Sequence, residues 1–166
     1  MVKVTFQQEE VTLLGDEIKV GDKAPNFKVL SNDLKEIGLE DYEGKVKLIS
    51  VVPSVDTGVC SKQTKRFNDE VEKLDNVKVL TISMDLPFAQ ARWRQENDVR
   101  NLDLFSDHRD ADFGEKYGVL IKELRLLARA IFIVDTNNKV TYVEYVDEVT
   151  NHPNYDEALA QAKKAE

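Results

Sequence analysis

Apolar residues around the middle of the first half of the chain follow two different spacings. Residues 46–52 form a short apolar run, which is typical of a strand buried on both faces, and Pro53 ends it. Farther along, five mostly apolar residues follow one another at intervals of three or four positions, as on the buried stripe of an amphipathic helix: Cys60, Thr64, Phe67, Val71 and Leu74. The pattern therefore predicts a strand followed by a helix that holds Cys60 in its first turn.

The rest of the pattern predicts a mixed sheet. Residues 77–83 form a second apolar strand, so the order strand, helix, strand is a βαβ unit with a right-handed crossover. Further strands are expected at 102–105, 130–135 and 140–145, and helices at 87–96, 110–117 and 154–164. The last two strands form a hairpin whose turn contains Asn138, since asparagine adopts positive φ readily.

The N-terminal segment predicts a β-hairpin. Residues 2–6 alternate between apolar and polar side chains, and a second apolar stretch follows at residues 11–14. Together, the parallel core strands, the later hairpin and the closing helix predict an α/β fold of the thioredoxin type, with a mixed central sheet flanked by helices. A chain of 166 residues with 42% hydrophobic content is long enough for one well-filled core. We expect a single domain that spans residues 1–166.

Net charge and cysteine content exclude several classes of binding partner and of site. The net charge of −8 argues against nucleic acid or an anionic membrane as the main partner, because both would repel the chain. No segment has the length of a transmembrane helix, and the N-terminus lacks the pattern of a signal peptide, so we expect a cytoplasmic protein. A single cysteine excludes an internal disulfide and a zinc site built from several thiolates.

The position of Cys60 has two interpretations. At the start of a helix, unpaired amide N–H groups and the helix dipole favour a thiolate over a thiol, which is the reactive form of cysteine. A buried cysteine can equally act as a small apolar side chain. Position alone leaves both interpretations open.

Four stretches of the chain resemble one family. Residues 53–60, Pro-Ser-Val-Asp-Thr-Gly-Val-Cys, resemble the P-x-x-x-[TS]-x-x-C motif of peroxiredoxins. Residues 83–90, Ser-Met-Asp-Leu-Pro-Phe-Ala-Gln, are similar to the segment that marks the bacterial thiol peroxidase subfamily. Residues 127–132 resemble the family's arginine-bearing strand, and residues 21–27 its early G-D-x-A-P-x-F stretch. The resemblance is collinear and covers essentially the whole chain.

The resemblance implies a catalytic role for four residues. Cys60 would be the peroxidatic cysteine, Thr57 would orient the sulfur and the peroxide through its hydroxyl, and Pro53 would shield the site from water. Arg129 would stabilise the thiolate and the reacting oxygens, for which a guanidinium that is always charged is well suited. The thiolate would displace hydroxide or alkoxide from a peroxide and become a sulfenic acid, without a metal, haem or flavin.

One position departs from the subfamily. Its resolving cysteine usually follows the aromatic residue after the Phe-Ala-Gln segment, whereas this chain has Arg94 there. With no second thiol, an external thiol must reduce the sulfenic acid, so we expect a one-cysteine thiol peroxidase that uses thioredoxin or another thiol. The resemblance further implies hydrogen peroxide and alkyl hydroperoxides as substrates, and a homodimer.

Two alternatives are weighed against this interpretation. Cys60 and Arg66 have the C-x5-R spacing of cysteine phosphatases, but residues 61–65 lack the glycine-like freedom that a phosphate loop needs. The second alternative is a catalytically decayed thioredoxin-fold redox sensor or binding module, since fold alone does not determine function.

Trp93 and Asp107 lie outside these four stretches. Trp93 fits either core packing or, together with Phe88, an interface or a pocket wall for an alkyl hydroperoxide. Asp107 belongs to an acidic run that we interpret as a solvated helix start.

Overall fold

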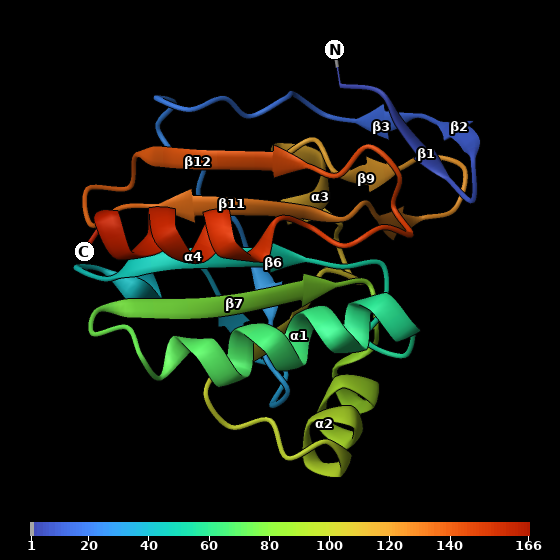
Figure 1. The fold of residues 1–166 in the computed structure, drawn as a ribbon. Coiled ribbons are helices and arrows are strands. Elements are labelled where there is room, and N and C mark those ends of the chain that lie inside the picture. Colours follow the sequence, from blue (N-terminus) through green and yellow to red (C-terminus); the bar gives the residue numbers. More distant parts are fainter. Residues whose placement is uncertain (1) are drawn as a thin grey trace.

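A mixed sheet of seven strands forms the centre of the molecule (Figure 1). The structure is a computed structural model that describes residues 2–166. The strands of the central sheet lie in the order β12-β11-β6-β7-β8-β4-β5. Their bounds are β4 (Val29–Leu30), β5 (Glu36–Ile37), β6 (Val46–Val51), β7 (Val77–Ser83), β8 (Asp103–Ser106), β11 (Ala130–Val134) and β12 (Val140–Tyr145). The helices are η1 (Leu39–Tyr42), α1 (Gly58–Val71), α2 (Pro87–Glu96), α3 (Asp112–Lys116) and α4 (Tyr155–Lys164).

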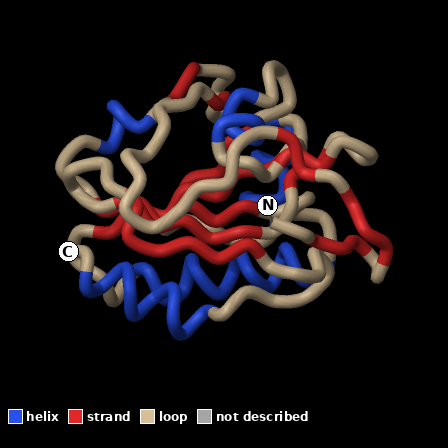
Figure 2. Tube along the Cα trace, turned by 90° about the horizontal axis from the view of Figure 1, so that it is seen from above, coloured by secondary structure: helices blue, strands red, loops and turns tan. Residues whose placement is uncertain are grey.

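The two middle strands, β6 and β7, are parallel, and β11 joins β6 in antiparallel orientation. Every residue of β6 is buried, because both faces of the sheet are covered. Figure 2 shows α1 and α4 on one side of the strands, and the short helices η1 and α3 on the other. Successive residues of β6 accordingly enter different cores: Leu48 packs in the cluster that contains Phe67 of α1, and Ile49 in the cluster that contains Phe113 of α3.

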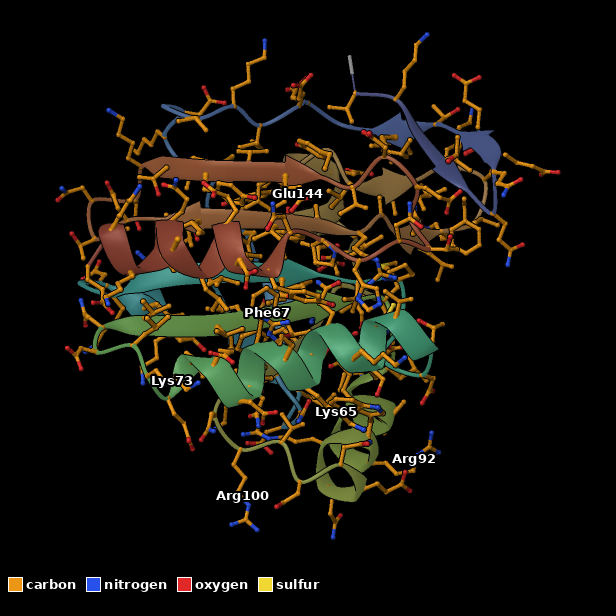
Figure 3. The ribbon with its side chains drawn as sticks, viewed as in Figure 1. Lys65, Phe67, Lys73, Arg92, Arg100 and Glu144 are labelled. Atoms are coloured by element: carbon orange, nitrogen blue, oxygen red, sulfur yellow. The ribbon has the colours of Figure 1, made fainter. Side chains whose placement is uncertain are left out.

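Helix α1 has the amphipathic character that its sequence predicts. Figure 3 shows Phe67 between α1 and the sheet, where it is completely buried, while Lys65 is exposed. Trp93 of α2 is buried in the same core cluster as Phe67, so its packing interpretation is correct. The C-terminal hairpin is also confirmed, and Asn138 adopts a φ of 61° in its turn.

The N-terminal hairpin is confirmed with a different second strand. Strand β1 (Val4–Phe6) pairs with β2 (Glu9–Val11), not with an apolar strand at residues 11–14. The leucines at 13 and 14 form a separate strand, β3 (Leu13–Leu14), in a small sheet with β9 (Leu120–Ile121) and β10 (Leu126–Leu127). Strands of two residues are too short to show a period, so they are not recognised from sequence.

The interpretation of Asp107 as a solvated residue is wrong. Its side chain is 2% exposed and accepts hydrogen bonds from the amides of Phe113 and Gly114, at 3.0 and 2.8 Å. Ala111, with a φ of 51°, turns the chain so that these amides of α3 point back to the carboxylate. Burial raises the pKa of Asp107 to about 6.

None of the helices within residues 2–166 has the length and apolar character needed to cross a membrane.

Candidate active site

Cys60 lies where β6 gives way to α1. It is the third residue of the helix, its side chain is fully buried, and it is a free thiol. The hydroxyl of Thr64, one turn later, donates to the Cys60 carbonyl at 2.8 Å. The first turn of a helix leaves amide N–H groups without intrahelical partners, so negative charge on this sulfur is favoured by its position.

Arg129 is held against the sulfur by three hydrogen bonds. It immediately precedes β11 and is 2% exposed. One terminal nitrogen donates to Sγ of Cys60 at 3.1 Å, the other to Oε1 of Gln63 at 2.8 Å, and Nε donates to the carbonyl of Val149 at 2.7 Å. A buried guanidinium that is fixed on three sides stabilises negative charge on the sulfur without having to reorganise.

Gln63 connects this arginine to the central sheet. Its side-chain nitrogen donates to Oγ of Ser50 on β6 at 2.8 Å, and both residues are completely buried. Gln63 is not among the residues that the family motif predicts for the site. A signal was present, because Gln63 follows Cys60 by three residues and so lies on the buried side of the helix, where a polar side chain needs a partner.

A pocket of about 310 Å³ is lined by Arg129, the residue that contacts the buried sulfur. Its walls come from the N-terminal hairpin, the loop before α1, and the segment between β12 and α4; they are formed by Phe6, Gln7, Pro53, Thr57, Gly58, Val59, Arg129, Val149 and Thr150. Most of these groups are apolar, and Arg129 is the charged residue among them. The pocket therefore offers an apolar enclosure with a guanidinium at the end nearest Cys60.

The four residues predicted as a site are brought together, in two different ways. Cys60 and Arg129 are in direct contact, whereas Pro53 and Thr57 contribute to the pocket wall. Thr57 is exposed and its hydroxyl donates to the carbonyl of Ser54 at 3.1 Å. Its predicted interaction with the sulfur and the peroxide stays a prediction.

Asp85 holds the loop that carries Pro53 and Thr57. Its carboxylate accepts from Oγ of Ser54 at 2.6 Å, from the amide of Val55 at 2.9 Å and from Oγ of Ser83 at 2.7 Å. The loop is thereby tied to the end of β7. The sequence shows Asp85 only as part of the segment 83–90, because its two partners in the loop, Ser54 and Val55, lie about 30 residues away along the chain.

The phosphatase alternative is wrong for a structural reason. Residues 58–71 form one continuous helix, so no amide-lined loop exists between Cys60 and Arg66. Arg66 lies on the outer face, where it pairs with Asp156 at 3.0 Å and covers the ring of Tyr155. Its guanidinium is directed to the surface, not to the sulfur.

Other candidate residues lie outside the pocket above Cys60. Phe88 is 67% exposed at the start of α2, so it does not form a wall of that pocket. Arg94, at the position of the expected resolving cysteine, donates from Nε to the carbonyl of Val99 at 3.0 Å and lines a separate surface depression. In Figure 3, Arg92 and Arg100 extend outward from α2 and from the segment after it.

Comparison with known proteins identifies the family. Residues 19–159 match the Redoxin family. The chain is 63% identical to a thiol peroxidase of Oceanobacillus iheyensis, over 99% of this chain and 100% of that protein. A peroxiredoxin-like protein from Aquifex aeolicus, 43% identical, matches it with a TM-score of 0.94 over 100% of this chain and 98% of the other. A thiol peroxidase from Chromobacterium violaceum, 27% identical, matches with a TM-score of 0.88 over 99% and 98%.

These likenesses cover nearly the whole of each chain. They confirm the α/β thioredoxin-like fold with its mixed central sheet, flanking helices and N-terminal hairpin. The chain belongs to the thiol peroxidases, enzymes of the Redoxin family of peroxiredoxins.

Proposed function

We propose that the chain reduces hydrogen peroxide and alkyl hydroperoxides through a sulfenic acid on Cys60. The observation that carries this proposal is the 3.1 Å contact between Arg129 and the Cys60 sulfur below an apolar pocket. The thiolate attacks one peroxide oxygen, the O–O bond breaks, and hydroxide or alkoxide leaves and takes up a proton. The sulfur keeps one oxygen as Cys60 sulfenic acid.

The surrounding groups have separate roles in this reaction. Arg129 stabilises the thiolate and the charge that develops on the leaving oxygen, because its donors are fixed before the peroxide arrives. Pro53, in the pocket wall, keeps water away from the sulfur, and Thr57 orients the peroxide through its hydroxyl. The chemistry of the thiol and the guanidinium suffices for this step, so the proposal includes no metal, haem or flavin.

We further propose a one-cysteine cycle. Cys60 is the single cysteine of the sequence and position 94 is arginine, so the second thiol comes from another molecule, thioredoxin or a different thiol. That thiol condenses with the sulfenic acid to form a mixed disulfide and water. A second external thiol then attacks the mixed disulfide, which releases the Cys60 thiol and an oxidised reductant.

Intact-protein mass spectrometry tests the first half of this cycle. One equivalent of peroxide should add one oxygen to the wild-type chain, and an added small thiol should convert that species to its adduct. Cys60→Ser should show neither change, which makes it the matched control. An unmodified wild-type thiol after peroxide exposure would sink the proposal.

Steady-state turnover tests the second half and the alternative of a redox sensor. Peroxide consumption is measured side by side with thioredoxin, glutaredoxin and low-molecular-weight thiols. Sustained turnover with any one of them supports an enzyme and identifies its class of reductant. A single stoichiometric oxidation without turnover supports a sensor.

The chain is further proposed to act as one domain, residues 1–166, in the cytoplasm and as a homodimer. Exposed apolar side chains at the start of α2, Leu86 at 53% and Phe88 at 67%, support a partner surface there. Light scattering at micromolar concentration measures the oligomeric state, and a monomeric mass contradicts the dimer.

A further inference from the structure

The two residues at the tip of the N-terminal hairpin adopt backbone φ angles that their side chains do not favour. Strands β1 and β2 are joined by Gln7 and Gln8, whose φ angles are 51° and 70°. A two-residue hairpin turn with positive φ at both positions favours Asn and Gly, because other side chains crowd the backbone there. Something outside the turn must therefore hold these two glutamines in place.

Glu148 supplies that support. Its two carboxylate oxygens accept from the amides of Gln7 and Gln8, at 3.3 and 2.6 Å. They also accept from the hydroxyl of Thr150 at 2.5 Å, its amide at 2.7 Å and the hydroxyl of Thr5 at 2.9 Å. Although desolvation opposes it, these hydrogen bonds lower the pKa of Glu148 to about 2, so the carboxylate is ionised at neutral pH.

The segment that carries Glu148 also positions the reacting centre. Figure 1 shows the blue hairpin beside the orange connection between β12 and α4. Val149 donates its amide to the carbonyl of Thr5 at 2.8 Å, and its own carbonyl accepts from Nε of Arg129 at 2.7 Å. One short segment thus contacts the hairpin on one side and the guanidinium beside Cys60 on the other.

The supported hairpin forms a wall of the pocket. Phe6 and Gln7 line it together with Thr150 and with Pro53 and Thr57 of the loop before α1. Without the carboxylate, the two turn amides lose their side-chain acceptor, and the hydroxyl of Thr5 keeps only its 3.5 Å contact with the carbonyl of Asp147. The shape of the pocket therefore depends on Glu148, although Glu148 itself does not line it.

We propose that Glu148 is a positioning residue that holds the hairpin tip as a wall of the Cys60 pocket and so sets the affinity for the organic part of a hydroperoxide. The proposal rests on the function proposed for Cys60. The wall contacts the substituent of an organic hydroperoxide, whereas the O–O group reacts at the opposite end, beside Arg129. Loss of the wall should therefore weaken binding of a bulky hydroperoxide and spare hydrogen peroxide.

The test compares Glu148→Gln with Glu123→Gln. Glu123 accepts from the amide of Thr12 at 2.8 Å, so it holds the same N-terminal segment but at a point outside the pocket wall. For Glu148→Gln we expect the KM for cumene hydroperoxide to rise about tenfold, the size of effect that one lost apolar contact has on substrate discrimination. The kinetics with hydrogen peroxide should stay near wild type, and Glu123→Gln should match wild type for both peroxides.

A rescue variant separates positioning from general destabilisation. Gln8→Gly places a residue that tolerates positive φ in the turn, and Gln8 is not a wall residue. In the Glu148→Gln background it should return the KM for cumene hydroperoxide toward the wild-type value. Hydrogen exchange of the Gln7 and Gln8 amides provides a readout independent of activity: it should be faster in Glu148→Gln than in Glu123→Gln.

Equal losses with both peroxides, or unchanged exchange of the two amides in Glu148→Gln, would overturn the proposal. Failure of the underlying function is recognised separately, because wild-type Cys60 would then resist oxidation by either peroxide while the amide exchange still reports on the hairpin.

Discussion

A terminal nitrogen of Arg129 donates to the Cys60 sulfur at 3.1 Å, and the other two nitrogens of the same guanidinium donate to Gln63 and to the carbonyl of Val149. Lysine in place of Arg129 keeps the charge but cannot make these three bonds together. For Arg129→Lys we expect the rate of Cys60 oxidation to fall about 10²- to 10³-fold, the loss typical of removing one oriented donor. Rapid quenching followed by mass spectrometry measures this rate.

Arg66→Lys is the matched control for that experiment. Arg66 lies on the outer face of α1 in an exposed pair with Asp156, so its replacement should leave the oxidation rate unchanged. Equal rates in Arg129→Lys and Arg66→Lys would mean that the contact with the sulfur has no part in the reaction.

Gln63→Met should destabilise the fold and slow oxidation together. Methionine fills a similar volume but leaves a terminal nitrogen of Arg129 and the hydroxyl of Ser50 buried without Gln63 as their partner. An unsatisfied buried polar group lowers the free energy of unfolding by about 1–3 kcal/mol. Urea unfolding measures the change, with the exposed Gln95→Met as the control; a stability equal to that of the control would contradict the argument.

Asp85→Asn should loosen the loop before α1. Asparagine offers one acceptor oxygen and turns an NH₂ group toward donors that the carboxylate accepts from, including the amide of Val55. We expect slower oxidation of Cys60 and faster hydrogen exchange at Val55. Asp56→Asn, in the same loop but exposed and 4.0 Å from Arg92, should change neither quantity. If both variants behave alike, Asp85 does not position the loop.

Asp107 predicts a pH-dependent contribution to stability. Burial raises its pKa from 3.8 to about 6, and the amide hydrogen bonds from Gly114 and Phe113 oppose this only in part. Because the folded state favours the protonated acid, the contribution is present below about pH 4 and is lost as the pH rises through 6. The difference in unfolding free energy between wild type and Asp107→Asn should change by roughly 3 kcal/mol across that window. A difference that is constant with pH would contradict the raised pKa.

Periodicity predicted the elements that are long enough to show it. The strand at 46–52, the helix of Cys60 and the strand at 77–83 are long enough to show their spacing, and the structure has them as β6, α1 and β7. The pairs β9 with β10 and β3 with β9 were not predicted, because strands of two residues are too short to show a period.

The residues of the candidate site that belong to a family motif could be predicted from the sequence. Cys60 and Arg129 came from the resemblance to peroxiredoxins, and the structure brings them into contact across 69 residues of sequence. Gln63, Asp85 and Glu148 were not assigned, because a polar side chain acquires its role from a tertiary partner that spacing does not reveal. The buried Asp107 was misread for the same reason, since an acid before a short helix is usually solvated.

Because Cys60 is the chain's one thiol and is completely buried, its reaction with a thiol reagent measures how often the surrounding structure opens. A bulky disulfide reagent cannot reach Cys60 while α1 and the pocket walls are in place, so each labelling event counts an opening of this region. Under conditions where reclosing is faster than labelling, the labelling rate divided by the rate for an unprotected thiol gives the equilibrium constant of that opening. A large thiol partner must reach the same sulfur, so the same measurement on the oxidised chain reports how accessible Cys60 is to its reductant.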